Sequence, residues 1–247
     1  MRLIFVRHCE PDYDNDTLTE KGFLEAKALA DFYKDMYVDE IYTSPLPRAF
    51  LTCEAFASYH KDTPVEAIEE LREFNQDEAR LPDLPKRNGR NHVSWDFLPR
   101  MMCDEKVLYD YNSYFDSKWF NGSKAKELYD ASIAQLDRIL LKHGYHYNEK
   151  GYFDVLKESK ETIVIFSHLG KISVLLSHLL KIPHVVLAQH FCLLTSSVTV
   201  VVTEEREQGI AQFRCLKMGD TSHLAAANLD ESFKARWAEV YSDPERH

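Results

Sequence analysis

The chain has 247 residues, of which 45% are hydrophobic and 28% charged, the composition of a globular protein that can bury a core without disulfides. A formal net charge of −10 argues against a broad basic footprint, so we expect no nucleic-acid or membrane partner. Five widely spaced cysteines without a C-x-x-C pair predict free thiols in a reducing compartment. The short apolar run before Arg7 is not typical of a secretory leader, so we expect a cytoplasmic protein.

Segments rich in Val, Ile and Phe predict β-strands along the chain. In chain order they cover residues 2–8, 40–45, 65–71, 162–168, 196–205 and 211–218. The segments at 40–45 and 65–71 are the weaker patterns. The last segment follows Gly209 and is expected to pair with 196–203 as a hairpin.

Amphipathic patterns predict helices at 19–36, 47–59 and 170–180, with Thr19 as the first N-cap and Pro47 in a first turn. Their apolar faces are expected to hold Phe23, Ala26, Leu29, Ala30 and Tyr33; Phe50, Cys53, Phe56 and Ala57; and Ile172, Leu175, Leu176 and Leu179. Strands that alternate with helices predict an α/β fold, with a mostly parallel central sheet and helices on both faces.

Residues 75–122 break this alternation with prolines, basic residues and many aromatics. We interpret this stretch as an insertion that folds over the site within a single domain of residues 1–247. Its basic residues suggest a second anion contact, and its aromatics suggest packing on an apolar or ring-bearing leaving group. The favoured alternative is that the basic residues are solvated and the aromatics form a small core. The basic residues are Arg80, Lys86, Arg87, Arg90 and Arg100.

Polar side chains stand where the predicted strands end. Arg7 and His8 end the first strand, Arg48 falls in the first turn of the helix after 40–45, and His168 ends the strand 162–168. Ligands of open α/β sheets bind at the carboxyl ends of the strands, and arginines match the oxygens of phosphate. Each residue taken alone is typical of a surface cation or a structural histidine. Their conjunction favours an anion site, with phosphate as the first candidate.

Four segments together resemble the histidine phosphatase superfamily, in its phosphoglycerate-mutase-like branch. VRHCEPDYDNDTLTEKGFLEAKALADFY is similar to the family's R-H-G-E opening and L-T-x-x-G helix. IYTSPLPRAFLTCEAF resembles its S-x-L-x-R-A-x-x-T-A segment, LREF its L-x-E, and IVIFSHLGKISVLLSHLL its second histidine block. The segments follow the family's order and cover most of the first 75 residues and about 161–180.

The resemblance implies a role for each matching residue. His8 would be the nucleophile that takes the phosphoryl group, while Arg7, Arg48 and His168 would bind the phosphate and stabilise the transition state. Glu73 would donate a proton to the leaving group, although other carboxylates lie close to it in the sequence. No metal or other cofactor is implied, and metal-ligand spacings such as H-E-x-x-H do not occur.

The activity implied by the resemblance is metal-independent hydrolysis of small-molecule phosphomonoesters through a phosphohistidine, as in a histidine acid phosphatase-like enzyme. One alternative is a phosphoglycerate mutase-type phosphotransferase, which must shield its phosphoenzyme from water. The other is a phosphate-binding regulatory module without turnover. The physiological substrate and the oligomeric state stay open.

The chain departs from the family pattern at two glycines: Cys9 and Leu169 stand in their places. The replacements leave substrate range and efficiency open. The dipeptide His8-Cys9 also suggests the loop of cysteine phosphatases, H-C-x-x-x-x-x-R, but that loop needs an arginine where Asn15 stands. Because a thiol beside cations ionises readily, we also expect Cys9 to be prone to oxidation.

Overall fold

The computed structural model describes residues 1–75, 79–81, 92–232, 234, 240 and 242. Within them, one large sheet has the strand order β5-β4-β8-β1-β9-β10-β7-β6. Its strands are β1 (Arg2–Arg7), β4 (Glu40–Thr43), β5 (Val65–Ala67), β6 (Tyr145–Tyr147), β7 (Phe153–Val155), β8 (Thr162–Ser167), β9 (Val198–Glu207) and β10 (Ile210–Asp220). A separate small hairpin joins β2 (Pro11–Asp12) and β3 (Thr17–Leu18).

The helices are α1 (Glu20–Tyr33), α2 (Pro47–Ala57), α3 (Pro99–Asp104), α4 (Ala125–Lys142), α5 (Leu169–Leu180), α6 (His184–His190) and α7 (Ser222–Ala226). Short 3₁₀ turns occur at Glu69–Leu71, Lys106–Tyr109, Tyr114–Asp116 and Lys118–Phe120. No helix in the described part of the chain is long and apolar enough to cross a membrane.

The two halves of the sheet are paired differently. Strands β5, β4, β8 and β1 run parallel, whereas β9, β10, β7 and β6 join through antiparallel pairings. The predicted α/β fold class is confirmed, and the predicted parallel pairing lies in the half that carries the strand ends of interest. The predicted hairpin is also confirmed, as β9 with β10.

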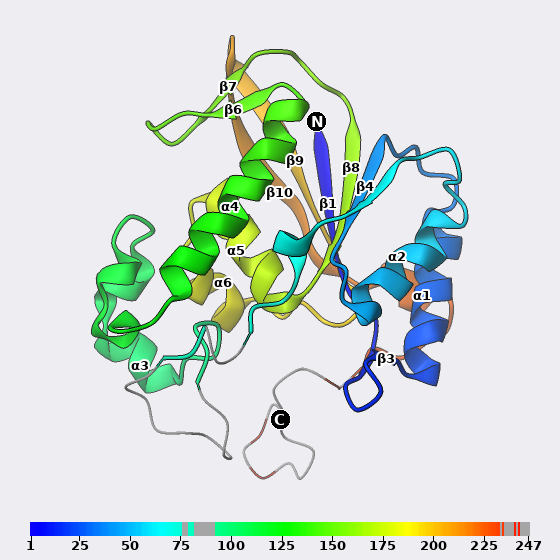
Figure 1. The fold of residues 1–247 in the computed structure, drawn as a ribbon, viewed down its shortest axis with the longest axis horizontal. Helices are drawn as coiled ribbons and strands as arrows, with labels where there is room; N and C mark the ends of the chain where they lie inside the picture. The colour runs from blue at the N-terminus through cyan, green and yellow to red at the C-terminus, as the bar shows by residue number, and fades with distance from the viewer. Residues whose placement is uncertain (76–78, 82–91, 233, 235–239, 241, 243–247) are drawn as a thin grey trace.

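The central strands are buried on both faces because helices cover each side of the sheet (Figure 1). In β1, Leu3 and Phe5 belong to the core under α4 and α5, while Ile4 and Val6 belong to the core under α1 and α2. Strand β8 alternates in the same way. Such continuous apolar strands are typical of parallel sheets covered on both faces.

All three predicted helices form, with two corrections to their faces. Thr19 caps α1, since its hydroxyl accepts the Gly22 N–H. Phe23 and Phe50, however, are 49% and 38% exposed and lie outside the buried faces. In α1 the buried positions near its start are Gly22, Glu25 and Ala26 instead, and a Cβ at Gly22 would clash with the Glu10 carbonyl oxygen. The sequence patterns did not predict α4, although it packs against α5.

The aromatic residues of the 75–122 stretch that the structure describes pack mostly into a core of their own. Phe97, Tyr114 and Phe120 are buried together with Tyr129 of α4 and Val174 of α5. The preferred alternative, a small aromatic core, is therefore confirmed for these residues. Arg80 and Arg100 are exposed, and Lys86, Arg87 and Arg90 lie outside the described residues.

Candidate active site

The carboxyl ends of β1, β8 and β4 lie side by side. The His8 N–H donates to the Ser167 carbonyl at 3.0 Å, and the Ser44 N–H donates to the Phe166 carbonyl at 2.9 Å. These bonds continue the parallel ladders one residue past the strands, so the residues that follow each strand meet at one edge of the sheet. The expected convergence of Arg7, His8 and His168 is thus what the parallel register produces.

His8 is held with one defined ring nitrogen free for chemistry. Its Nδ1 lies 2.8 Å from the Cys9 carbonyl oxygen, which can only accept, so Nδ1 carries the proton and Nε2 the lone pair. The side chain is buried. Burial, with the nearby Arg7 and Arg48 charges, holds the pKa of His8 well below its usual range. His8 is therefore a neutral imidazole with a nucleophilic Nε2.

His168 stands beside it, with ring centroids 5.1 Å apart. It is the N-cap residue of α5, and its Nε2 lies 2.8 Å from the Ser44 hydroxyl at the end of β4. Burial, with the nearby Arg48 and Arg7 charges, keeps the pKa of His168 well below the usual value. Its Nδ1 is buried and has no hydrogen-bond partner among the described residues, so it is available to a bound group.

Two arginines supply the positive charge of this edge. Arg7 is buried, and its Nη1 donates to the Leu193 carbonyl at 2.5 Å. Burial lowers the pKa of Arg7, yet an arginine stays charged under ordinary conditions. Arg48 lies in the first turn of α2, with its guanidinium 5.5 Å from the Tyr13 ring and its Nη1 3.8 Å from Asp16. A fork of donors near a neutral nucleophile suits a phosphate.

Glu73 is fixed at the start of α5. Its Oε2 accepts the Gly170 N–H and its Oε1 the Lys171 N–H, both at 3.0 Å, and the Phe74 N–H lies 3.1 Å from Oε1. Because Gly170 and Lys171 directly follow His168, these contacts place Glu73 beside the His168 end of the site. Of the neighbouring carboxylates, Glu66 and Glu69 are exposed. The structure thus brings all five predicted site residues together.

Sequence reasoning missed two residues of this edge. Ser44 orients His168, and its only sequence signal was its place at the end of a predicted strand. Gly170 lets Glu73 approach, because a Cβ there would lie 2.8 Å from Glu73 Oε1 and 3.0 Å from the Trp95 ring. The close approach that a glycine allows therefore occurs at Gly170, one residue after Leu169.

The two replaced glycines are not needed for backbone conformation. Neither Cys9 nor Leu169 has a positive φ. Cys9 is buried in a small apolar cluster with Leu18 and Ala26, and its N–H donates to the Thr52 hydroxyl. Burial raises the pKa of the Cys9 thiol well above its usual value, so the expectation of an oxidation-prone thiol is wrong. All five cysteines are free.

Among the residues that the structure describes, no three His, Cys, Asp or Glu side chains are placed to hold a metal ion. The chemistry that the described side chains offer at this edge is nucleophilic attack, anion binding and proton transfer.

Comparison with known proteins gives a matching family model and solved structures of the same fold. Residues 3–100 match the sequence model of the histidine phosphatase superfamily (branch 1). No curated protein sequence matches the chain. A phosphoserine phosphatase from Entamoeba histolytica, solved with phosphoserine, has 23% identity and a TM-score of 0.57, over 90% of this chain and 98% of that one.

Two further solved structures share the fold. A mycobacterial glucosyl-3-phosphoglycerate phosphatase has 17% identity and a TM-score of 0.56, over 88% of this chain and 98% of its own. The alpha-ribazole phosphatase of Shigella flexneri has 21% identity and a TM-score of 0.52, over 90% and 97%. The resemblance predicted from the sequence is thereby confirmed: the chain has the fold of the histidine phosphatase superfamily and carries its sequence pattern over residues 3–100.

Proposed function

We propose that the protein hydrolyses small-molecule phosphomonoesters without a metal, through a phosphohistidine on His8. The observation that carries this proposal is the state of His8: a buried, neutral imidazole whose Nδ1 proton is held by Cys9, beside two arginines and a second histidine. A lone pair fixed on Nε2 next to a cationic edge is suited to attack phosphorus.

The first step transfers the phosphoryl group to the protein. Nε2 of His8 forms a bond to phosphorus while the bond from phosphorus to the ester oxygen breaks. Arg7, Arg48 and the His168 ring hold the phosphoryl oxygens and stabilise the charge that they carry in the transition state. Glu73 enters this step in its protonated form, gives its proton to the oxygen of the leaving alcohol and is left as a carboxylate.

The second step returns the protein to its starting state. Water attacks phosphorus, Glu73 takes the proton of that water, and the bond between phosphorus and Nε2 breaks. Inorganic phosphate leaves and the lone pair returns to Nε2. Solved structures of the same fold are named phosphoserine phosphatase, glucosyl-3-phosphoglycerate phosphatase and alpha-ribazole phosphatase, and these names support small phosphorylated metabolites as the substrate class. Exposed free thiols at Cys103 and Cys192 support the cytoplasm as the proposed location.

The test is hydrolysis of p-nitrophenyl phosphate with EDTA present, by wild type, His8→Ala and a control, His146→Ala, at an exposed histidine. We expect wild type and the control to turn over and His8→Ala to be inactive. A phosphoenzyme trapped from labelled substrate by an alkaline denaturing quench should carry a label that is stable in base, is lost on later treatment with acid and is absent from His8→Ala. Equal activity in wild type and His8→Ala would contradict the proposal.

Two further assays separate the alternatives. With 3-phosphoglycerate, release of inorganic phosphate supports the hydrolase, whereas formation of 2-phosphoglycerate would identify a mutase. If a panel of phosphomonoesters gives no turnover but vanadate raises the melting temperature of the wild type, the protein is a phosphate-binding module.

A further inference from the structure

A buried carboxylate lies directly behind the nucleophile, outside the roles described above. Glu25 belongs to α1, and its side chain is 0% exposed. Its Oε2 accepts the Glu10 N–H at 2.8 Å. Its Oε1 forms no other hydrogen bond with a described residue, and the Thr195 hydroxyl lies close enough to lower the pKa of the carboxyl. A buried carboxyl group is costly unless hydrogen bonds or a partner charge compensate for its lost hydration.

The Glu10 N–H and the Cys9 carbonyl are two ends of one peptide group. The carbonyl end accepts the His8 Nδ1 proton at 2.8 Å, and the N–H end donates to Glu25. The chain of contacts therefore runs from the imidazole through one peptide plane to a carboxylate. Hydrogen bonds linked through an amide polarise one another, so a stronger acceptor at Glu25 makes the Cys9 oxygen a stronger acceptor as well.

We propose that Glu25 is a positioning residue that tunes the nucleophilicity of His8 through the Cys9–Glu10 peptide group. In the ionised form, Glu25 strengthens the pull of the Cys9 oxygen on the Nδ1 proton, which fixes the ring and enriches Nε2 in electron density. In the protonated form, the pull is weaker. The expected effect on catalytic activity rests on the proposed function, whereas the chain of hydrogen bonds from His8 to Glu25 does not.

The surroundings of Glu25 make its protonation state variable at neutral pH. Burial, opposed by the Glu10 N–H and reinforced by the Glu10 carboxylate, raises the pKa of Glu25 to about 7. The charged or titratable groups that face it are Glu10 and Cys9 in the turn after β1 and Lys21 on α1. From the loop before β9 the neutral Thr195 hydroxyl faces it, and Glu10 itself is bound by the Ser232 hydroxyl.

The isosteric variant Glu25→Gln separates tuning from packing. Its amide oxygen can still accept the Glu10 N–H, and its NH₂ group can face the Thr195 oxygen, but it carries no charge at any pH. We expect the ratio of wild-type to variant kcat/KM, measured on p-nitrophenyl phosphate, to rise from pH 5.5 to 8.5 with a midpoint near 7. The rise should be roughly threefold to tenfold, since a charged acceptor forms about twice as strong a hydrogen bond.

The control is Glu20→Gln, which removes the same charge from an exposed position on the same helix. Its ratio to wild type should not change with pH. A ratio for Glu25→Gln that is constant with pH, or that falls as pH rises, would overturn the proposal, because a purely structural role has no reason to follow the titration.

An NMR measurement keeps the proposal testable if the protein proves inactive. The ¹⁵N shifts of the His8 ring should change with a midpoint near pH 7 in wild type and lose this step in Glu25→Gln. The same step in both proteins would overturn the contact chain. No catalytic turnover together with a step seen only in wild type would contradict the proposed function and leave the contact chain supported.

Discussion

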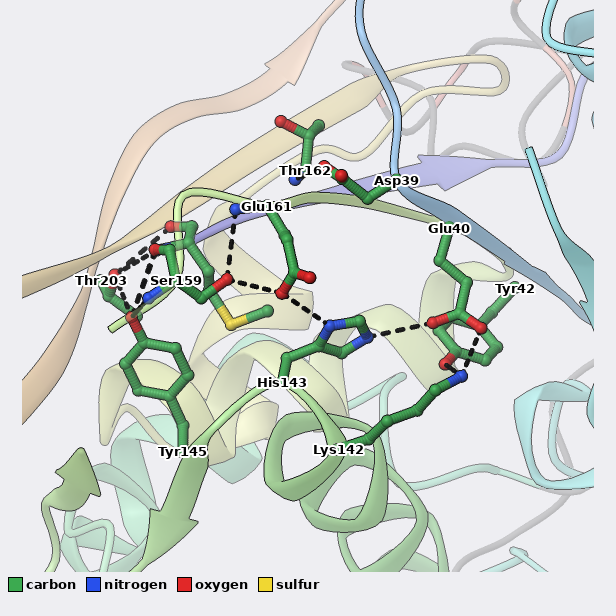
Figure 2. A network of polar contacts seen from close by, with 11 residues as sticks. Asp39, Glu40, Tyr42, Lys142, His143, Tyr145, Ser159, Glu161, Thr162 and Thr203 are labelled. Carbon is green, nitrogen blue, oxygen red and sulfur yellow. Dashed lines mark hydrogen bonds and ion pairs between the residues drawn. The ribbon is translucent and has the colours of Figure 1, made fainter. Parts of the chain in front are cut away.

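Buried histidines lie at both ends of the parallel half of the sheet, in opposite electrostatic settings. At the amino ends of β4 and β8, here called the amino edge, His143 lies between two carboxylates. Its Nε2 is 3.0 Å from Glu40 and its Nδ1 is 3.0 Å from Glu161 (Figure 2). Lys142 also contacts Glu40, and Ser159 donates to Glu161 at 2.6 Å. Positive and negative groups here satisfy one another and join the end of α4 to the starts of β4 and β8.

At the carboxyl ends of β1, β4 and β8, here called the carboxyl edge, positively charged groups lie close together instead. Arg7 and Arg48 lower the pKa of both His8 and His168, so each charge makes its neighbours harder to protonate. Glu73 is the carboxylate placed among them, and backbone N–H groups hold it in place. The comparison teaches that charge matched within the fold stabilises it, whereas an excess of one sign marks where a ligand of the other sign belongs.

The largest expected effect comes from removing one cation of the carboxyl edge. Arg48→Gln should lower kcat/KM for p-nitrophenyl phosphate by about 10²–10³-fold, because the transition state loses a charged donor. The free protein should unfold at an unchanged or slightly higher temperature, since repulsion falls. Phosphate should no longer raise that temperature. Arg138→Gln, at an exposed arginine of α4, is the control and should keep full activity. Unimpaired phosphate binding in Arg48→Gln would contradict the conclusion that the excess positive charge at this edge marks an anion site.

A smaller effect, and on stability alone, is expected at the amino edge. His143→Gln should lower the free energy of unfolding by about 2 kcal/mol, because two carboxylates lose a partner. Activity per folded molecule should change less than about twofold, as expected of a substitution at the sheet edge away from the site. Chemical denaturation followed by fluorescence measures the first quantity, and assays at low temperature measure the second.

The stability that this network contributes should fall as the pH becomes acidic. Contacts with Lys142 lower the pKa of Glu40, against the effect of its burial, and contacts with Ser159 and His143 lower that of Glu161. Their folded-state pKa values therefore lie below the unfolded ones, and the stability that they contribute is present above about pH 4.5 and lost as pH falls through the folded values. The penalty of His143→Gln should shrink in the same range. An undiminished penalty at pH 3 would contradict an ionic role for this network.

The carboxyl edge was largely predictable from sequence, and the amino edge was not. Apolar runs that end in Arg7-His8 and His168 predict both the strands and the place of the site, since parallel strands bring their ends together. The contact of His143 with Glu40 spans 103 residues, and no local pattern encodes it. The place of Glu25 was not predicted for a related reason. A carboxylate on an amphipathic helix is usually solvent-exposed, and tertiary packing is what shows that Glu25 faces the turn after His8.

The smallest effect tests whether the carboxyl edge needs the glycine that Cys9 replaces. Since φ at Cys9 is not positive, Cys9→Gly relieves no strain. It removes a buried thiol that packs with Leu18 and Ala26 and frees the backbone of the unfolded chain, so stability should fall by about 1 kcal/mol. Cys9→Ala, which keeps Cβ, should fall by less. Activity of both variants should stay within about twofold of wild type, because His8 Nδ1 binds the carbonyl and not the side chain of residue 9. A gain of tenfold or more in the activity of Cys9→Gly would show that the thiol narrows the site. The carboxyl edge would then bind an anion less well than its charges indicate.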